Sequence, residues 1–165
     1  MTITSETKYR DFVPYEKVLE EGEVQHIKKA AEQFFKPCHT LTLNEFWGCL
    51  VGNFELLGDM SDPSVLQVYW IKRFVDFAEE FTKTCERLNV KDVETEILQN
   101  GCVPLSAQES TLVFVQEFFG LHSFMQAGEI TIGEYILARK ARFNAYKVRK
   151  NNEARQLQKL KKRKK

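Results

Sequence analysis

PSVLQVYWIKRFVDFAEEFTKTCERL, residues 63–88, is the stretch that decides the fold. Large apolar side chains recur in it every three or four residues, among them Trp70 and Leu88, and this spacing places them on one face of a helix. Ser61 or Asp62 before a proline is typical of a helix start. Because a helix rises 1.5 Å per residue, roughly 26 residues extend about 40 Å. We therefore expect this helix to be the central element of the domain.

Two further helix starts carry a capping box, in which a Ser or Thr is followed three residues later by Glu. The first is Thr42 with Glu45, and the helix is expected to end near Gly58. Its Gly48 and Gly52 form a G-x-x-x-G motif, which predicts close packing against another helix.

The second of these starts is Ser106 with Glu109, opening a helix expected to reach about Ala127. Apolar side chains surround most of this helix, which indicates burial on more than one side. The β-branched residues within it also leave a short strand open as an alternative.

The remaining segments also favour helices. Residues 14–36 have apolar positions at helical spacing, with a break expected at Gly22 and an end at Pro37. A short helix is expected over residues 92–99 and a basic one from Thr131 onward. The predicted fold is all-α, an irregular bundle of about six to seven helices with a long basic C-terminal helix projecting from the body.

The length of 165 residues allows one full hydrophobic core. We predict an extended or flexible segment over residues 1–13, a single helical domain over residues 14–148 and a basic helical arm over residues 149–165. The apolar face of the last helix, with Ile136, Phe143 and Val148, is expected to dock on the domain.

Charge is strongly segregated along the chain. Residues 1–137 hold 11 bases and 22 acids, a formal charge of −11, whereas residues 139–165 hold 13 bases and one acid, a formal charge of +12. The near-neutral total of +1 is therefore a cancellation. A concentrated positive field attracts carboxylate or phosphate surfaces, so the basic segment is the candidate partner-binding site.

Eleven basic residues form this candidate site: Arg139, Arg142, Arg149, Lys150, Arg155, Lys159, Lys161, Lys162, Arg163, Lys164 and Lys165. Three interpretations remain open from the sequence: a solubilising tail, a contact with an acidic protein surface such as a neighbouring copy of this chain, and non-specific contact with nucleic-acid phosphates. No aromatic residue follows Tyr146, so stacking on bases is not expected.

No catalytic, cofactor-binding or metal-binding motif is present in the sequence, and we predict a non-enzymatic protein without cofactors. The pair Cys38 and His39 is the nearest approach to a reactive or metal-binding cluster, and its two residues are most simply ordinary loop residues. The cysteines lack short paired spacing and are expected to be free thiols; they are Cys38, Cys49, Cys85 and Cys102.

Two heptapeptides and the layout around them resemble a known class of protein. LTLNEFW (residues 41–47) and ITIGEYI (residues 130–136), with a long aromatic helix between them and a basic end, look like small helical virion or assembly proteins of tailed bacteriophages that work near the portal and tail. The resemblance implies a non-enzymatic protein that works in many copies around a ring or tube. Its partners would be copies of itself or other assembly components.

Residues 1–10 are polar, and no apolar stretch reaches the roughly 18 residues that span a bilayer. We therefore expect no secretory signal and no membrane association. The expected location is cytoplasmic, which means the virion or the host cytoplasm if the phage resemblance holds.

Overall fold

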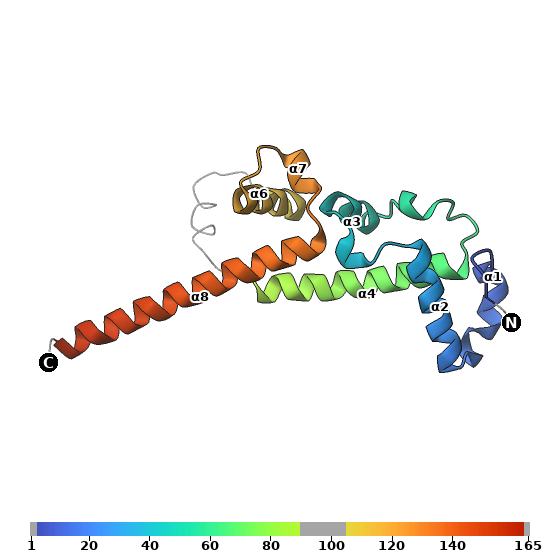
Figure 1. The fold of residues 1–165 in the computed structure, drawn as a ribbon, viewed down its shortest axis with the longest axis horizontal. Helices are drawn as coiled ribbons and strands as arrows, with labels where there is room; N and C mark the ends of the chain where they lie inside the picture. The colour runs from blue at the N-terminus through green and yellow to red at the C-terminus, as the bar shows by residue number, and fades with distance from the viewer. Residues whose placement is uncertain (1–2, 90–104, 164–165) are drawn as a thin grey trace. The chain divides into compact units, whose positions relative to one another are not determined.

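The computed structural model describes residues 3–89 and 105–163, and the regular elements in these ranges are helices (Figure 1). The predicted all-α class with a long C-terminal helix is confirmed. The helix predicted over residues 92–99 and Cys102 lie outside the described residues.

The chain divides into two compact units, residues 1–82 and 83–165, where the sequence predicted one helical domain over residues 14–148. The boundary falls inside helix α4, Val65–Arg87. Since the helical pattern continues unbroken across it, no change of composition marks the boundary. Each unit is described separately below.

In the first unit, short helices precede α4. In chain order they are α1 (Tyr9–Phe12), the 3₁₀ turn η1 (Val13–Val18), α2 (Glu21–Phe34), η2 (Cys38–Thr40), α3 (Leu43–Leu50) and η3 (Glu55–Leu57).

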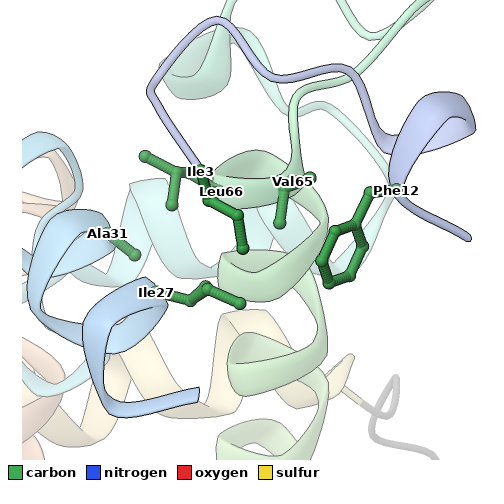
Figure 2. Packing of buried hydrophobic residues seen from close by; sticks show 6 residues of the cluster. All are labelled: Ile3, Phe12, Ile27, Ala31, Val65 and Leu66. Atoms are coloured by element: carbon green, nitrogen blue, oxygen red, sulfur yellow. The ribbon is translucent and has the colours of Figure 1, made fainter. Parts of the chain in front are cut away.

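The N-terminal segment, residues 1–13, differs from the extended or flexible segment that was predicted. It contains α1, and its Ile3 and Phe12 are buried with Ile27 and Ala31 of α2 and with Val65 and Leu66 of α4 (Figure 2). Two backbone hydrogen bonds join it to the start of α4, from Tyr9 N to Pro63 O and from Val65 N to Thr7 O. The sequence did not reveal this because the segment's apolar residues are too few to show a period.

Helix α2 begins at Glu21, so Gly22 lies inside the helix and does not break it. The break predicted at Gly22 instead lies at Leu19 and Glu20, which have extended backbone. The Glu20 amide donates to Glu23 Oε2 at 3.3 Å, which supplies a partner at the helix start. A glycine in the first turn costs little there, since the turn is held by its cap.

Helix α3 has the predicted capping box but is shorter than predicted. Thr42 N donates to Glu45 Oε2 at 2.9 Å, and Glu45 N donates to Thr42 Oγ1 at 3.2 Å. The helix ends at Leu50 because Gly52 takes a φ of +83°, a left-handed conformation that glycine adopts freely. The predicted close helix packing at Gly48 and Gly52 is wrong, since among the described residues a Cβ at Gly48 would meet only the Asn53 carbonyl, at 4.0 Å, and a Cβ at Gly52 would meet nothing within 4 Å.

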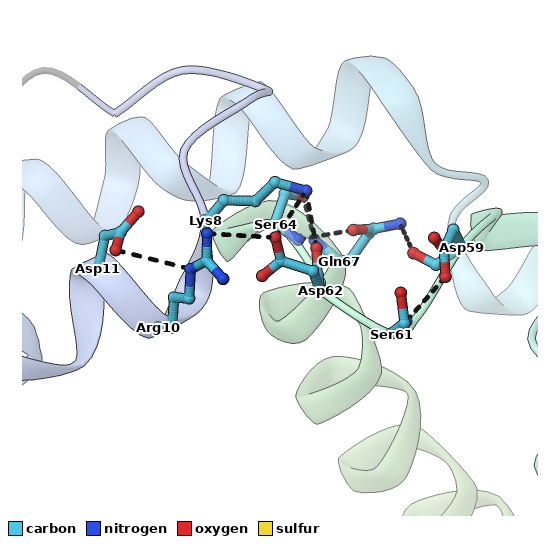
Figure 3. A network of polar contacts seen from close by, with 8 residues as sticks. All are labelled: Lys8, Arg10, Asp11, Asp59, Ser61, Asp62, Ser64 and Gln67. Carbon is cyan, nitrogen blue, oxygen red and sulfur yellow. Dashed lines mark hydrogen bonds and ion pairs between the residues drawn. The ribbon is translucent and has the colours of Figure 1, made fainter.

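A polar network sets the start of α4 (Figure 3). The cap is Ser64 rather than the predicted Ser61 or Asp62: Ser64 N donates to Gln67 Oε1 at 2.6 Å, and Gln67 N donates to Ser64 Oγ at 3.2 Å. Asp62 instead receives Lys8, whose Nζ donates to the Asp62 carbonyl at 2.8 Å. This network fixes the N-terminal segment against the beginning of α4.

An aromatic cluster holds α3 against α4 in the first unit. Phe46 is 1% exposed, and its ring lies 5.5 Å from that of Phe74 and 4.9 Å from that of Phe81. Trp70 stacks on Phe74 at 5.5 Å, and its indole Nε1 donates to the Lys36 carbonyl at 3.0 Å. The predicted aromatic face of α4 is thus the core of this unit.

The second unit contains α6 (Ala107–Phe119), α7 (Phe124–Gly128) and α8 (Ile132–Arg163), together with the last residues of α4. Ser106 and Glu109 form the predicted capping box, and the segment is helix rather than strand. It ends earlier than predicted because Gly120 has a φ of +64° and closes the helix in a left-handed conformation.

Candidate interaction surface on the basic helix

Helix α8 begins at a capping box. Thr131 N donates to Glu134 Oε2 at 2.9 Å, and Glu134 N donates to Thr131 Oγ1 at 3.2 Å. Hydrogen bonds from the Thr131 backbone and side chain hold the pKa of Glu134 below its ordinary value of 4.5. A carboxylate at this end also complements the positive end of the helix dipole, so the direction of the basic helix is fixed at its start.

The first turns of α8 are packed within the second unit. Ile132, Tyr135 and Ala138 are at most 4% exposed. The ring of Tyr135 meets that of Phe114 on α6 edge to face at 5.7 Å. These contacts anchor one end of the basic helix.

Arg139 belongs to this anchor, although the sequence placed it in the candidate partner-binding site. Its guanidinium lies 5.3 Å from the ring centre of Phe114 and 6.0 Å from that of Tyr135. One terminal nitrogen donates to the Cys85 carbonyl at 3.4 Å, and the Nε is buried without a hydrogen-bond partner among the described residues. Arg139 is therefore an internal packing residue of the second unit.

The groups around Arg139 are shifted toward their neutral forms. Burial raises the pKa of the Tyr135 hydroxyl and the pKa of the Cys85 thiol. The buried cation opposes the rise at both groups, but burial is the larger cause. A cysteine whose pKa is raised is a poor nucleophile, so this cluster favours packing over chemistry.

The other predicted binding residues within the described range lie on exposed turns of α8. Arg142 is exposed with its guanidinium 5.4 Å from the Phe114 ring centre. Every residue from Lys147 to Lys161 is exposed. The arm residues with described side chains are Arg149, Lys150, Arg155, Lys159 and Lys161. Lys162 and Arg163 lie in the last turn of the helix, and Lys164 and Lys165 lie outside the described residues.

The single acid of the arm, Glu153, faces the bases that precede it. It lies 3.4 Å from Lys150 and 3.9 Å from Arg149. Both bases also lie 5.7 Å from the ring centre of Tyr146. These exposed pairs contribute little to stability, and beyond Glu153 no acid offsets the charge in the sequence.

A stripe at alternating spacings of four and three runs along α8, and its members are Arg139, Phe143, Tyr146, Lys150, Glu153, Leu157 and Leu160. Its beginning is packed and half-buried, whereas Leu157 and Leu160 are 59% and 54% exposed. Val148, predicted to dock, is 60% exposed because it lies off this stripe. We call Leu157 and Leu160 the leucine pair.

The sequence reasoning missed two features, one on α8 and one in the first unit. The first is the leucine pair as a continuation of the packed face; the alternation of four and three was the signal that could have revealed it. The second is a pocket of about 410 Å³ in the first unit, lined by Ile3, Phe12, Tyr15, Val18, Leu19, Glu20 and Glu23. No local motif marks this pocket, since segments on both sides of η1 form it.

Among the described residues, no group of three or more His, Cys, Asp and Glu side chains is placed to hold a metal ion. Burial raises the pKa of Cys38 and that of Cys49, and His39 is exposed on η2. Over the same ranges no helix has the length and apolar character to cross a membrane.

Comparison with known proteins finds no matching family model, no similar curated protein and no similar solved structure. The basic helix therefore carries the argument about function by its own geometry and charge.

Proposed function

We propose that this chain is a non-enzymatic structural or adaptor protein that docks to neighbouring subunits or other assembly components through helix packing and its basic arm. The observation that carries the proposal is the arm itself: an anchored helix whose last turns are exposed, basic and partly apolar. A tail that only aided solubility would need neither an anchored direction nor exposed leucines at helical spacing. The phage virion or assembly role implied by the two heptapeptides belongs to this proposal.

The charge distribution supports docking to an acidic protein surface. The first unit, residues 1–82, has 14 acids and 8 bases, a formal charge of −6, while residues 139–165 carry +12. Opposite charges on two parts of one kind of molecule favour association between copies and speed their encounter. A contact between two different surfaces repeats from copy to copy, and it closes into a ring when the rotation allows.

The test is the native mass with and without residues 149–165, measured by light scattering at several concentrations. We expect the full chain to form assemblies of several copies and the shortened chain to form assemblies of fewer copies. Circular dichroism should show that the rest of the shortened chain keeps its helices, because residues 149–161 are exposed. An equal mass for both chains, with all partner contacts retained, contradicts the proposal.

A second candidate function, an accessory protein that contacts nucleic-acid phosphates, is favoured by one observation. Arg155 and Lys159 are exposed and lie one turn apart on the side of α8 away from the leucine pair. This candidate predicts a gel shift of DNA or RNA at low salt that weakens linearly in log–log form as salt rises. Absence of any shift at low salt rejects it.

A further inference from the structure

The pocket of the first unit combines an apolar floor with an acidic rim. Ile3 and Phe12, 8% and 4% exposed, belong to the buried cluster beneath it (Figure 2). Tyr15 and Val18 on its wall are 54% and 76% exposed. These two side chains expose a large apolar area for one short stretch of chain. The neighbouring Ile3 and Phe12 pack against α2 and α4, which holds the wall of the pocket in place.

The rim of the pocket is acidic. Glu20 and Glu23 line it, and both are exposed at the start of α2. Glu16 of η1 does not line the pocket and is already engaged, since one oxygen receives Lys72 and the other receives the Tyr9 hydroxyl at 3.0 Å. Glu20 and Glu23 also form the capping box of α2, but both are exposed carboxylates without an ion-pair partner among the described residues, so they supply the negative charge for a ligand that is apolar and basic.

The exposed end of α8 has the complementary composition. The leucine pair is separated by three residues, one helical turn, so both side chains point to one side. Lys161 follows directly and is exposed beside them. The leucine pair with its neighbouring cations matches an apolar pocket with an acidic rim in apolar character and in charge.

A second arm does not fit the leucine pair. Most positions on either side of the stripe are basic, with Lys140, Lys147 and Lys161 on one side and Arg142 and Arg149 on the other, while Ala154 and Gln156 are neutral. Two such helices laid together would place like charges against each other at most of these flanking positions. The charge pattern thus disfavours arm-to-arm pairing and favours an acidic acceptor.

We propose that the leucine pair of one copy inserts into the pocket formed by Phe12, Val18 and Leu19 of a second copy, with Lys161 against Glu20 and Glu23. This inference rests on the proposed docking function and names its acceptor. Each copy carries both the arm and this pocket, so the contact joins copies head to tail. The opposite side of the arm, with Arg155 and Lys159, stays open in this arrangement.

Two full-length variants test the contact. The arm variant is Leu157→Gln with Leu160→Gln, which keeps the helix and its charge because glutamine is a good helix former. The pocket variant is Val18→Lys with Glu20→Gln and Glu23→Gln, all at exposed positions. Removing the apolar contact should weaken self-association on the order of 10-fold or more, measured by analytical ultracentrifugation.

The matched controls are Val148→Gln and Val13→Lys. Val148 is 60% exposed on the same helix but nine residues, or about two and a half turns, from Leu157, so it lies on the opposite side. Val13 is 47% exposed beside the pocket without lining it. Both controls should associate like the unmodified chain.

Mixing the two variants gives the decisive result. Neither assembles by itself, yet the arm variant keeps its pocket and the pocket variant keeps its arm, so together they should form a one-to-one complex. A monomeric unmodified chain, or a mixture that forms no complex, overturns the inference. Association that needs residues 149–165 but ignores the pocket variant also overturns it while leaving the proposed function intact. Association that ignores the arm altogether contradicts both.

Discussion

Replacing Arg139 separates packing from charge in the anchor of α8. Arg139→Ala removes two methylene groups, Cγ and Cδ, from a half-buried position, which costs about 1 kcal/mol. It also removes the contacts with the rings of Phe114 and Tyr135, worth about 1 to 2 kcal/mol together. Removal of the buried, unpartnered Nε stabilises the folded state by about 1 kcal/mol. The net expected loss in the free energy of unfolding is about 1 to 2 kcal/mol.

Arg139→Met gives a different result on the same reasoning. Methionine keeps most of the apolar stem and can contact both rings through its sulfur. The free energy lost with the cation–ring contacts and the free energy gained by removing the unpartnered Nε then nearly cancel. The free energy of unfolding should therefore stay within about 0.5 kcal/mol of that of the unmodified chain.

Urea unfolding followed by circular dichroism measures the stabilities, and hydrogen exchange of α8 amides locates the change. Arg142→Met is the matched control, since Arg142 lies near the same Phe114 ring but is exposed. It should change the stability by less than about 0.5 kcal/mol. If Arg139→Met destabilises as much as Arg139→Ala, the guanidinium contacts outweigh the buried Nε and the reasoning is refuted.

Two further predictions concern the core and the start of α8. Phe46→Ala should cost about 3 to 5 kcal/mol, because a 1% exposed ring with aromatic neighbours leaves a cavity, and tryptophan fluorescence during urea unfolding should record it. Thr131→Ala should cost about 1 kcal/mol at neutral pH through loss of the α8 cap. The pKa of Glu134 is lowered in the folded state, so its contribution is present above the ordinary value of 4.5 and is lost as the pH falls through the folded pKa. Thr131→Ala removes the bond from Thr131 Oγ1 to the Glu134 carboxylate, which is lost on acidification, and the bond from Glu134 N to Thr131 Oγ1, which is not. The stability difference between Thr131→Ala and the unmodified chain should therefore shrink on acidification without vanishing; a difference that does not change with pH contradicts the assigned role of the Glu134 carboxylate in the cap.

The sequence was most informative where a helix start is encoded locally. The boxes predicted at Thr42 and Ser106 are confirmed, and the helix start expected at Thr131 has the same box, because a cap depends on residues only three apart. The helix ends were overestimated, since Gly52 and Gly120 stop their helices by adopting a left-handed conformation that composition does not require. The cap at Ser64 was missed because the proline before it suggested an earlier start.

Long-range features could not be predicted in the same way. Burial of Ile3 depends on contacts with α2 and α4, which no local pattern records. The boundary between the two units falls within a continuous helix, where sequence gives no linker signal. Arg139 was assigned to the binding site by its charge, and only its position beside Phe114 shows that it packs inside.

Anchoring changes what the segregated charge can do. A flexible basic tail meets any acidic surface in many orientations, whereas the last turns of α8 continue a helix whose first turns are buried. Basic residues near the C-terminal end complement the helix dipole and support this order despite their mutual repulsion. The leucine pair then selects one side of the arm for apolar contact, and Arg155 and Lys159 remain on the other. The two sides of the arm should therefore respond differently to salt. Raised salt should weaken binding through the cations, whereas binding through apolar insertion of the leucines should persist.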